Sequence, residues 1–459
     1  MTIVRRLTVT GVAVSLALLL ALPVASAAAA SASASAMQAN AAPLPQLPQQ
    51  AAARQAAQWL VTQFNAQGFI PVTSGGSQAN LSATVQSVLS LSAANVDPTL
   101  AHQALGYLET NVDAFVVQQG VDGPGQLALL ILDAEALGVS PTDFGGADLV
   151  TRLLATEQTT GLDAGLFGTE NQATNYSAGG YQQGLALAAL AAAGVTGQSQ
   201  VSTAIAWLVQ AQCPDGGWTT PDNTNNACSG TPANFAGPDT NSTALAIQGL
   251  AAQGALTSSV STSALRFLET GQDSDGGWSY FSNTSATPGI TDPDSTALVI
   301  QSLVALGVSP TSTPFVKRSS NPVSALLSFQ LTSGNGAGAF FFPPGPSGAD
   351  LLATYQAVPA LAGLAFGFGP SGRSYWEVAS DGGIFNYGSG AGFFGSMGGT
   401  ALNKPIVGIA ASPDGQGYWE VASDGGVFAF GDAGFSGSAG SLPLNEPVVG
   451  IAVGLKPPT

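Results

Sequence analysis

The sequence predicts a mainly α-helical protein, an (α/α)6 toroid followed by a small all-β repeat module. Two internal repeats support this prediction. An apolar, helix-like segment recurs along most of the chain, and a segment rich in aromatic and β-branched residues recurs after residue 365. The chain is 45% hydrophobic and only 8% charged, so it can surround its most apolar segments with protein.

The first residues have the pattern of a secretory signal peptide. Two arginines precede an apolar run at 12–22, and the small residues 25–27 offer a peptidase site. The run is too short to span a bilayer comfortably. We therefore expect a signal peptide at 1–29, a flexible leader rich in Ala, Ser, Pro and Gln at 30–50, and a secreted, extracellular protein without a membrane span after signal removal.

The charge and the cysteines limit the classes of partner. The chain has 10 Lys and Arg against 27 Asp and Glu, a formal net charge of -17, which excludes nucleic acid as a partner. The two cysteines, Cys213 and Cys228, flank one loop of a chain expected in an oxidising space, so we expect a disulfide. Metal binding by these thiols is the weaker alternative, because no histidine is near them in the sequence.

Six copies of one apolar helix are expected to form the inside of the toroid. The segments 241–254 and 294–307 match along their whole length, and weaker copies begin at Ser82, Gly125, Tyr181 and Asp350. Most copies open with a capping residue such as Asp, Asn or Ser and close with Gly or Asn. Apolar residues cover nearly every face of 294–307, which indicates a helix surrounded by protein.

Amphipathic segments before these copies are expected to be outer helices. Examples are 201–210 and 263–269, which have one apolar and one polar face. Six outer and six inner helices make a toroid over 51–364. An open solenoid of helical hairpins is the alternative, but it would need polar capping repeats at its ends, and the sequence shows no distinct caps.

A repeated loop motif follows two of the outer helices. One copy runs from Trp207 through Gln212 and Gly216 to Trp218, and the other runs from Phe267 through Gln272 and Gly276 to Trp278. Degenerate copies lie at 59–69, 153–167 and 326–340. This pattern resembles the QW repeat of the terpene cyclase and protein prenyltransferase superfamily, which includes a transcobalamin-like branch. The resemblance covers about residues 50 to 365, and it implies framework roles for Gln212, Trp218, Gln272 and Trp278.

The catalytic motifs of this superfamily are incomplete here. Class II cyclases use an Asp-x-Asp-Asp acid motif, and the nearest match, Asp292-Pro293-Asp294-Ser295, lacks the last aspartate. Because Asp294 aligns with Asn241 and Asp350 at helix starts, we expect it to be an N-cap, with a catalytic role for Asp292 and Asp294 as the alternative.

No metal site is predicted. Prenyltransferases hold zinc with Asp, Cys and His, but the only histidine, His102, is far from both cysteines in sequence. The Asp273–Gly276 stretch is similar to a calcium loop, although it falls inside the repeated turn.

The remaining interpretation is ligand binding at one mouth of the toroid. Parallel inner helices would bring their N-termini together there, near aromatic and polar residues. The candidate ligand-binding residues are Tyr176, Phe235, Asn241, Tyr280, Phe281, Asp294, Phe341 and Asp350. In the competing interpretation the aromatic residues simply plug the ring. No cofactor is predicted, although the transcobalamin-like branch implies a corrinoid as a ligand.

The leading functional hypothesis is therefore a secreted, non-catalytic protein that binds a small molecule or a cell-surface ligand. The alternative is a terpene cyclase-like enzyme with a degenerate Asp-x-Asp-Asp acid motif.

Residues 365–459 are expected to form the β module. The segment 375–388 recurs at 418–431, and a Ser-Asp-Gly-Gly sequence in each copy is typical of a tight hairpin turn. The repeat of about 43 residues resembles propeller-like tandem repeats of exported bacterial proteins, which implies four short strands per unit. We also expect the first strand of a third unit at 448–452, and an open edge that packs on the toroid or mediates self-association.

Overall fold

The fold was analysed in a computed structural model of the chain. It describes residues 48–169, 179–220, 227–229, 237–281, 290–343, 345, 348–366, 375–387, 393–412, 417–431 and 433–453. The signal peptide expected at 1–29 and most of the expected leader lie outside these residues. The leader is shorter than expected, because helix α2 begins at Pro48. No helix among the described residues is long and apolar enough to cross a membrane.

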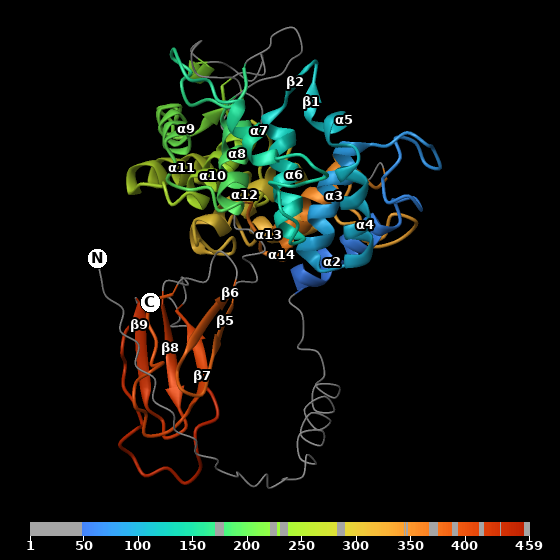
Figure 1. Cartoon of the computed structure of the whole chain (residues 1–459). Coiled ribbons are helices and arrows are strands. Elements are labelled where there is room, and N and C mark those ends of the chain that lie inside the picture. The colour runs from blue at the N-terminus through green and yellow to red at the C-terminus, as the bar shows by residue number, and fades with distance from the viewer. Residues whose placement is uncertain are drawn as a thin grey trace, which may run out of the picture. The chain divides into compact units, whose positions relative to one another are not determined.

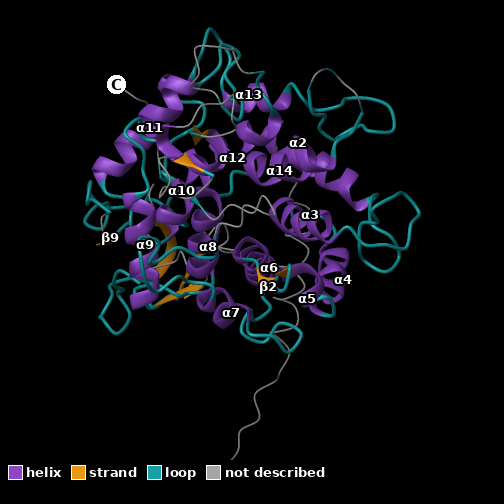
Figure 2. Cartoon of the chain, turned by 90° about the horizontal axis from the view of Figure 1, so that it is seen from above, coloured by secondary structure: helices purple, strands orange, loops and turns teal. Residues whose placement is uncertain are grey.

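Inner helices form a closed ring within the described residues, as Figure 2 shows from above. They are α3 (Leu81–Ala94), α6 (Pro124–Ala136), α8 (Gly180–Ala192), α10 (Thr240–Ala252), α12 (Pro293–Ala305) and α14 (Leu351–Ala362). Each packs on the next in chain order, and α14 packs back on α3. The closed toroid is therefore confirmed, and the open solenoid is excluded.

More amphipathic helices lie outside this ring (Figure 1). They are α2 (Pro48–Val61), α4 (Pro98–Glu109), α7 (Leu149–Ala155), α9 (Ser199–Gln210), α11 (Ser258–Gly271) and α13 (Pro322–Leu327). The connections carry the short elements α5 (Val112–Val116), β1 (Val117–Gln118), β2 (Val121–Asp122), β3 (Trp218–Thr219), η2 (Ala227–Ser229), β4 (Pro238–Asp239) and η4 (Thr313–Phe315).

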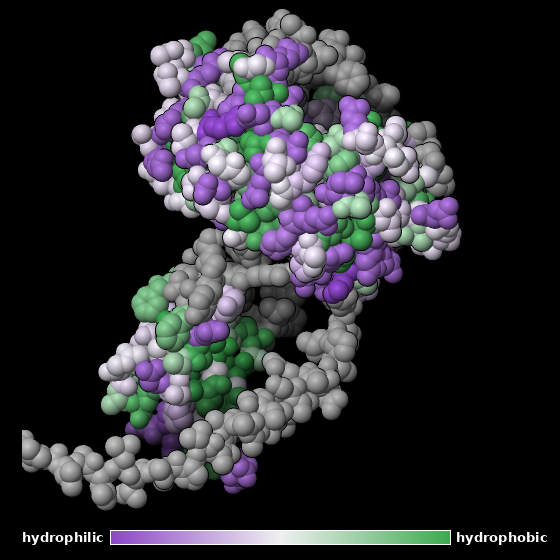
Figure 3. Space-filling view, turned by 45° about the vertical axis from the view of Figure 1, so that its right-hand side comes forward, coloured by the Kyte–Doolittle hydropathy of each residue, from purple (hydrophilic) through white to green (hydrophobic). Residues whose placement is uncertain are grey.

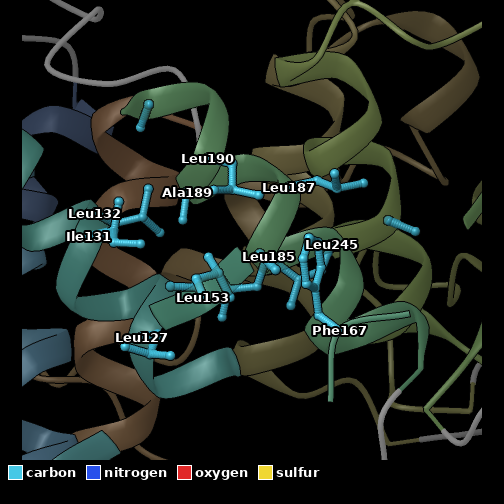
Figure 4. Close-up of a cluster of buried hydrophobic side chains, with 14 of the residues drawn as sticks. Leu127, Ile131, Leu132, Leu153, Phe167, Leu185, Leu187, Ala189, Leu190 and Leu245 are labelled. Carbon is cyan, nitrogen blue, oxygen red and sulfur yellow. The ribbon is translucent and has the colours of Figure 1, made fainter. Parts of the chain in front are cut away.

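Apolar residues on almost every face explain why the inner helices are buried. In α12, every residue from Pro293 to Leu303 is buried. Figure 4 shows Leu127, Ile131 and Leu132 of α6 in the same cluster as Leu187 and Leu190 of α8. Burial of this kind stabilises the folded state by about 1.5–3 kcal/mol for each large apolar side chain.

The closest helix pair is α8 and α10, and two glycines make this approach feasible. A Cβ atom on Gly184 would lie 2.2 Å from the carbonyl oxygen of Leu245, and one on Gly249 would lie 2.2 Å from the carbonyl oxygen of Gly184. Because real Cβ atoms do not approach backbone this closely, only glycine fits at either position without displacing a helix.

Glutamines of the repeated loops connect neighbouring hairpins. Gln212 Nε2 donates to the carbonyl of Gly216 in its own loop and to that of Val260 in the next outer helix. Gln272 likewise donates to the carbonyls of Gly276 and Phe315. Each glutamine therefore joins its own loop to the hairpin that follows.

The tryptophans of the same motif fill the space behind each loop. Trp218 and Trp278 are fully buried. Their Nε1 atoms donate to the carbonyls of Leu208 and Leu268, at 2.7 and 2.8 Å. Each indole therefore packs in the core with its polar atom satisfied, as a framework residue must.

The expected disulfide between Cys213 and Cys228 is confirmed, with the two Cα atoms 5.5 Å apart. Cys213 lies in the loop after α9, and Cys228 lies in η2. The bond fixes η2 to the base of a repeated loop.

The β module contains two small antiparallel sheets among its described residues. One pairs β5 (Tyr375–Val378) with β6 (Ile384–Tyr387), and the other has the order β7 (Ile406–Ala411), β8 (Gly417–Ala422) and β9 (Val427–Gly431). Figure 3 shows hydrophobic residues gathered on one face of this module.

The module differs from the expected four-stranded units. No described sheet has more than three strands, and 448–452 is not a strand, although Val448 N donates to the carbonyl of Ser423. The Ser-Asp-Gly-Gly turns do occur as expected, with Gly382 and Gly425 at φ values of 81° and 84° that favour glycine.

Candidate functional site

A pocket of about 150 Å³ lies inside the ring of inner helices. Its lining residues are Ser82, Gln86, Phe115, Gly125, Gln126, Leu129, Tyr181, Gln182, Leu185, Leu245, Leu298, Gln356 and Phe366. All six inner helices contribute residues from their first half. The inner helices are therefore parallel, and their N-termini meet at the mouth of this pocket.

The pocket wall has two layers along the helices, a polar layer near the mouth and a mostly apolar layer further in. The sixth residues of the inner helices, which lie at one depth, are Gln86, Leu129, Leu185, Leu245, Leu298 and Gln356. Nearer to the mouth are the polar residues Ser82, Gln126, Tyr181 and Gln182. Leucine side chains therefore line most of the middle of the pocket, and amide and hydroxyl groups line its mouth.

Several hydrogen-bond acceptors at this site are buried and have no partner. Gln126 Oε1 and Gln356 Oε1 belong to residues that line the pocket. Asn241 Oδ1 and Asp294 Oδ1 belong to the second residues of α10 and α12. An unpaired buried acceptor costs about 1–3 kcal/mol, so a molecule that brings hydrogen-bond donors would be stabilised here.

Asp294 is not the N-cap of its helix, so that expectation is wrong. The cap is Asp292, whose Oδ1 accepts from the backbone N of Ser295 at 2.7 Å. Asp239 and Asp350 cap α10 and α14 in the same way. Asp294 aligns instead with Asn241, inside the first turn, where its carboxyl group is free for another role.

Burial holds Asp294 in its uncharged form. The residue is 7% exposed. Its burial, together with the nearby charges of Asp292 and Asp350, raises the pKa of Asp294 from 3.8 to about 8. The carboxyl group can therefore donate a proton or a hydrogen bond at neutral pH.

Two tyrosines on other helices are near enough to feel the charge of Asp294. Burial and the charge of Asp294 together raise the pKa values of Tyr181 and Tyr355, that of Tyr181 to about 12. Tyr355 accepts a hydrogen bond from Gln86 Nε2 at 3.0 Å. Both phenols remain neutral, and the hydrogen bond between Gln86 and Tyr355 joins α3 to α14.

A second buried carboxyl group lies inside the ring. Besides Asp294, the interior holds Asp133 on α6, which is fully buried and whose pKa is raised well above its ordinary value by that burial. The sequence signal was available, since Asp133 directly follows the apolar run 127–132.

Those sequence-predicted ligand-binding residues that the structure describes lie around the mouth but do not line the pocket. Tyr280 donates or accepts a hydrogen bond with Thr220 at 2.7 Å, and its ring packs on Phe281. Phe341 packs on Phe329, and Asp350 is a helix cap. Tyr176 and Phe235 lie outside the described residues.

The glutamines were missed by the sequence reasoning. Gln86, Gln126, Gln182 and Gln356 are polar residues inside apolar helices, and this was the signal that could have identified them.

A metal site has no support in the described part of the chain. It holds no group of three or more His, Cys, Asp and Glu residues that could bind a metal ion. His102 is exposed on α4, with Nδ1 2.7 Å from the carbonyl of Pro98. In the calcium-like stretch, Asp273 and Asp275 accept hydrogen bonds from Thr291, which stabilises the turn.

Comparisons with known proteins agree with a terpene cyclase-like toroid. The squalene-hopene cyclase C-terminal domain matches residues 150–291, which include both copies of the repeated loop, 207–218 and 267–278. No curated protein sequence matches the chain. The matched segment is thus similar to a domain of the superfamily that the QW pattern indicated.

Solved structures in which the chain follows a similar course have low sequence identity to this protein. A type II terpene cyclase from Scytonema (MstE_Y157F, apo) has 17% identity and a TM-score of 0.46, covering 69% of this chain and 96% of its own. A protein from Actinoplanes has 15% identity and a TM-score of 0.45, covering 69% and 98%. The structure described as UGL_D88N with dGlcA-Glc-Rha-Glc has 14% identity and a TM-score of 0.49, covering 70% and 98%.

Proposed function

We propose that this protein is a secreted, non-catalytic binder of a small, uncharged, hydroxyl-bearing molecule, held inside a terpene cyclase-like toroid. One observation carries the proposal: the pocket wall among the inner helices combines leucines with Gln126 and Gln356, whose buried amide oxygens have no hydrogen-bond partner. Such a wall binds an apolar body, and the oxygens accept hydrogen bonds from its hydroxyl groups.

The electrostatics of the mouth favour a neutral ligand. Six helix N-termini place partial positive charge there, and the N-cap carboxylates of Asp292 and Asp350 offset it. Asp294 is uncharged at neutral pH, so it attracts no cation. A pocket of about 150 Å³ is smaller than the roughly 300 Å³ at which drug-sized sites begin, so a small molecule fits better than a corrinoid.

A second candidate function is a terpene cyclase-like enzyme, and one observation favours it. A carboxylic acid that stays protonated near neutral pH is what alkene protonation requires, and Asp294 has a pKa of about 8 beside Tyr181 and Tyr355. Ser295 stands where the Asp-x-Asp-Asp motif has its last aspartate, which leaves one fewer carboxylate to support the acid.

The experiment uses the purified mature chain with butanediol as the probe, in a titration followed by protein NMR. Chemical shifts of residues around the pocket should change saturably. Gln126→Leu and Gln356→Leu should each weaken binding about fivefold, because each removes one hydrogen bond of about 1 kcal/mol. Gln198→Leu is the matched control on the exposed surface, and it should change nothing.

Two further incubations separate the alternatives. Squalene is incubated with the wild type and with Asp294→Asn, and the extract is analysed for cyclised product. Product from the wild type alone would establish the enzyme and refute the non-catalytic proposal. Cobalamin is dialysed against the protein, and retained colour would replace the small ligand by a corrinoid.

A further inference from the structure

A second polar layer lies deeper in the ring than the pocket. Its members are Asp133, Gln248 and Gln301, which are 0%, 0% and 1% exposed. Both carboxyl oxygens of Asp133, both amide atoms of Gln301 and the Nε2 atom of Gln248 have no hydrogen-bond partner. Removing such groups from water without a partner costs about 1–3 kcal/mol each, so a layer of three needs an explanation.

Helix geometry places this layer below the pocket, on the same faces of the helices. Gln248 follows the pocket residue Leu245 by three positions, and Gln301 follows Leu298 in the same way. Asp133 likewise follows Leu129 by four positions. Residues three or four apart share a helix face. Because all inner helices start at the pocket mouth, later residues on that face lie further inside.

Phe366 stands between the two layers. It lines the pocket, and its backbone N donates to Gln248 Oε1 at 2.8 Å. Phe366 follows α14, whose C-terminal end is remote from the pocket mouth, so this segment enters the ring from the opposite end. The Phe366 side chain therefore closes the floor of the pocket and covers the deeper amides.

We propose that the ring binds an elongated, uncharged molecule with hydrogen-bonding groups at both ends and an apolar middle, and that its far end reaches Asp133, Gln248 and Gln301 when Phe366 moves aside. This inference rests on the proposed function and specifies its ligand class. Four leucines between the polar layers match the apolar middle. Gln126 and Asp133 are seven residues apart, which sets the spacing of the layers at about 10 Å.

The chemistry of the deep layer suits such an end group. The amides of Gln248 and Gln301 both donate and accept hydrogen bonds, and Asp133 in its protonated form does the same. A hydroxyl or amide group would pair with these side chains, whereas an ion would meet no opposite charge. The layer therefore selects a neutral terminus.

The test compares octanediol with octanol and butanediol, by NMR titration of the full mature chain. Phe366→Ala should strengthen octanediol binding about tenfold relative to butanediol binding, because it removes the floor that only the longer diol must pass. Phe366→Leu, a milder change that keeps the core filled, should give a smaller gain. Gln301→Leu should abolish the preference for octanediol over octanol and leave butanediol binding intact.

The possible failures are distinguishable. If butanediol binds but Phe366→Ala and Phe366→Leu leave octanediol affinity unchanged, the elongated ligand is refuted and the proposed function stands. If no probe binds, the proposed function fails. Thermal unfolding of Gln301→Leu without ligand tests the role of the deep layer. If the Gln301 amide serves to bind a ligand, its removal from the core should raise Tm. A lowered Tm would show that the amide stabilises the fold, and it would overturn the inference.

Discussion

Gln330 and Ala52 join the last hairpin of the ring to the first. Gln330 Nε2 donates to the carbonyl of Ala52 at 3.0 Å and to that of Gly338 at 2.9 Å. Gln212 and Gln272 make the same pair of hydrogen bonds inside the ring. The interaction that spaces consecutive hairpins therefore also closes the toroid, across 278 positions of the chain.

Gln330→Leu tests this closure. We expect a loss of stability of about 1–3 kcal/mol, because the substitution leaves the two carbonyls without their donor. Thermal unfolding followed by circular dichroism measures the loss, and hydrogen exchange should become faster in α2. The surface control Gln198→Leu should unfold like the wild type, and equal unfolding of both variants would show that the hydrogen bond has no part in closure.

Gly184→Ala tests the close approach of α8 and α10. The new Cβ would lie 2.2 Å from the Leu245 carbonyl oxygen, so the helices must separate, and we expect a loss of at least about 1–3 kcal/mol. Gly106→Ala in α4 is the matched control, because a Cβ there meets nothing within 4 Å. The control should gain up to about 1 kcal/mol from helix propensity. Chemical denaturation of the two variants should therefore shift in opposite directions.

Asp294→Asn tests the buried carboxyl group through the pH dependence of stability. Since the pKa of Asp294 is about 8 in the folded chain and 3.8 ordinarily, the folded state binds more protons between these values. Stability therefore falls as pH rises through this window. The asparagine variant should lack this part of the fall, so it should exceed the wild type at pH 8 by about 2–5 kcal/mol and approach it near pH 4.

The measurement for Asp294→Asn is denaturant unfolding across this pH range. Asp239 contributes a similar fall, because burial raises its pKa to about 6, so only the difference between variant and wild type is diagnostic. The exposed Asp143→Asn variant serves as control. Parallel pH profiles of Asp294→Asn and the wild type would show that Asp294 is ionised in the folded chain.

Reduction of the Cys213–Cys228 disulfide should destabilise the toroid moderately. The bond closes a loop with a sequence separation of 15, for which chain entropy predicts about 3 kcal/mol. Unfolding with and without dithiothreitol measures this difference. The Cys213→Ser, Cys228→Ser double variant should behave like the reduced protein and respond to dithiothreitol no further.

The framework could be predicted from the sequence because its signals are local. The match between 241–254 and 294–307 identified the inner helices, and the spacing from Gln272 to Trp278 identified the loops, since hydrogen bonds within a hairpin depend on residues near in sequence. The N-cap of α12 was misplaced by two positions, because Asp292 and Asp294 are both good capping residues and only backbone geometry distinguishes them.

The sequence by itself determined the helical repeats, the β repeats, the disulfide and the acidic, sparsely charged character of the chain. Only the tertiary structure decided that Gln126, Gln356 and Phe366 line one pocket and that Asp294 stays uncharged beside Tyr181. The physical reason is distance along the chain. Hydrophobic periodicity and helix capping depend on residues a few positions apart. The burial of a side chain, and which side chains lie near it, depend on the closure of the whole ring.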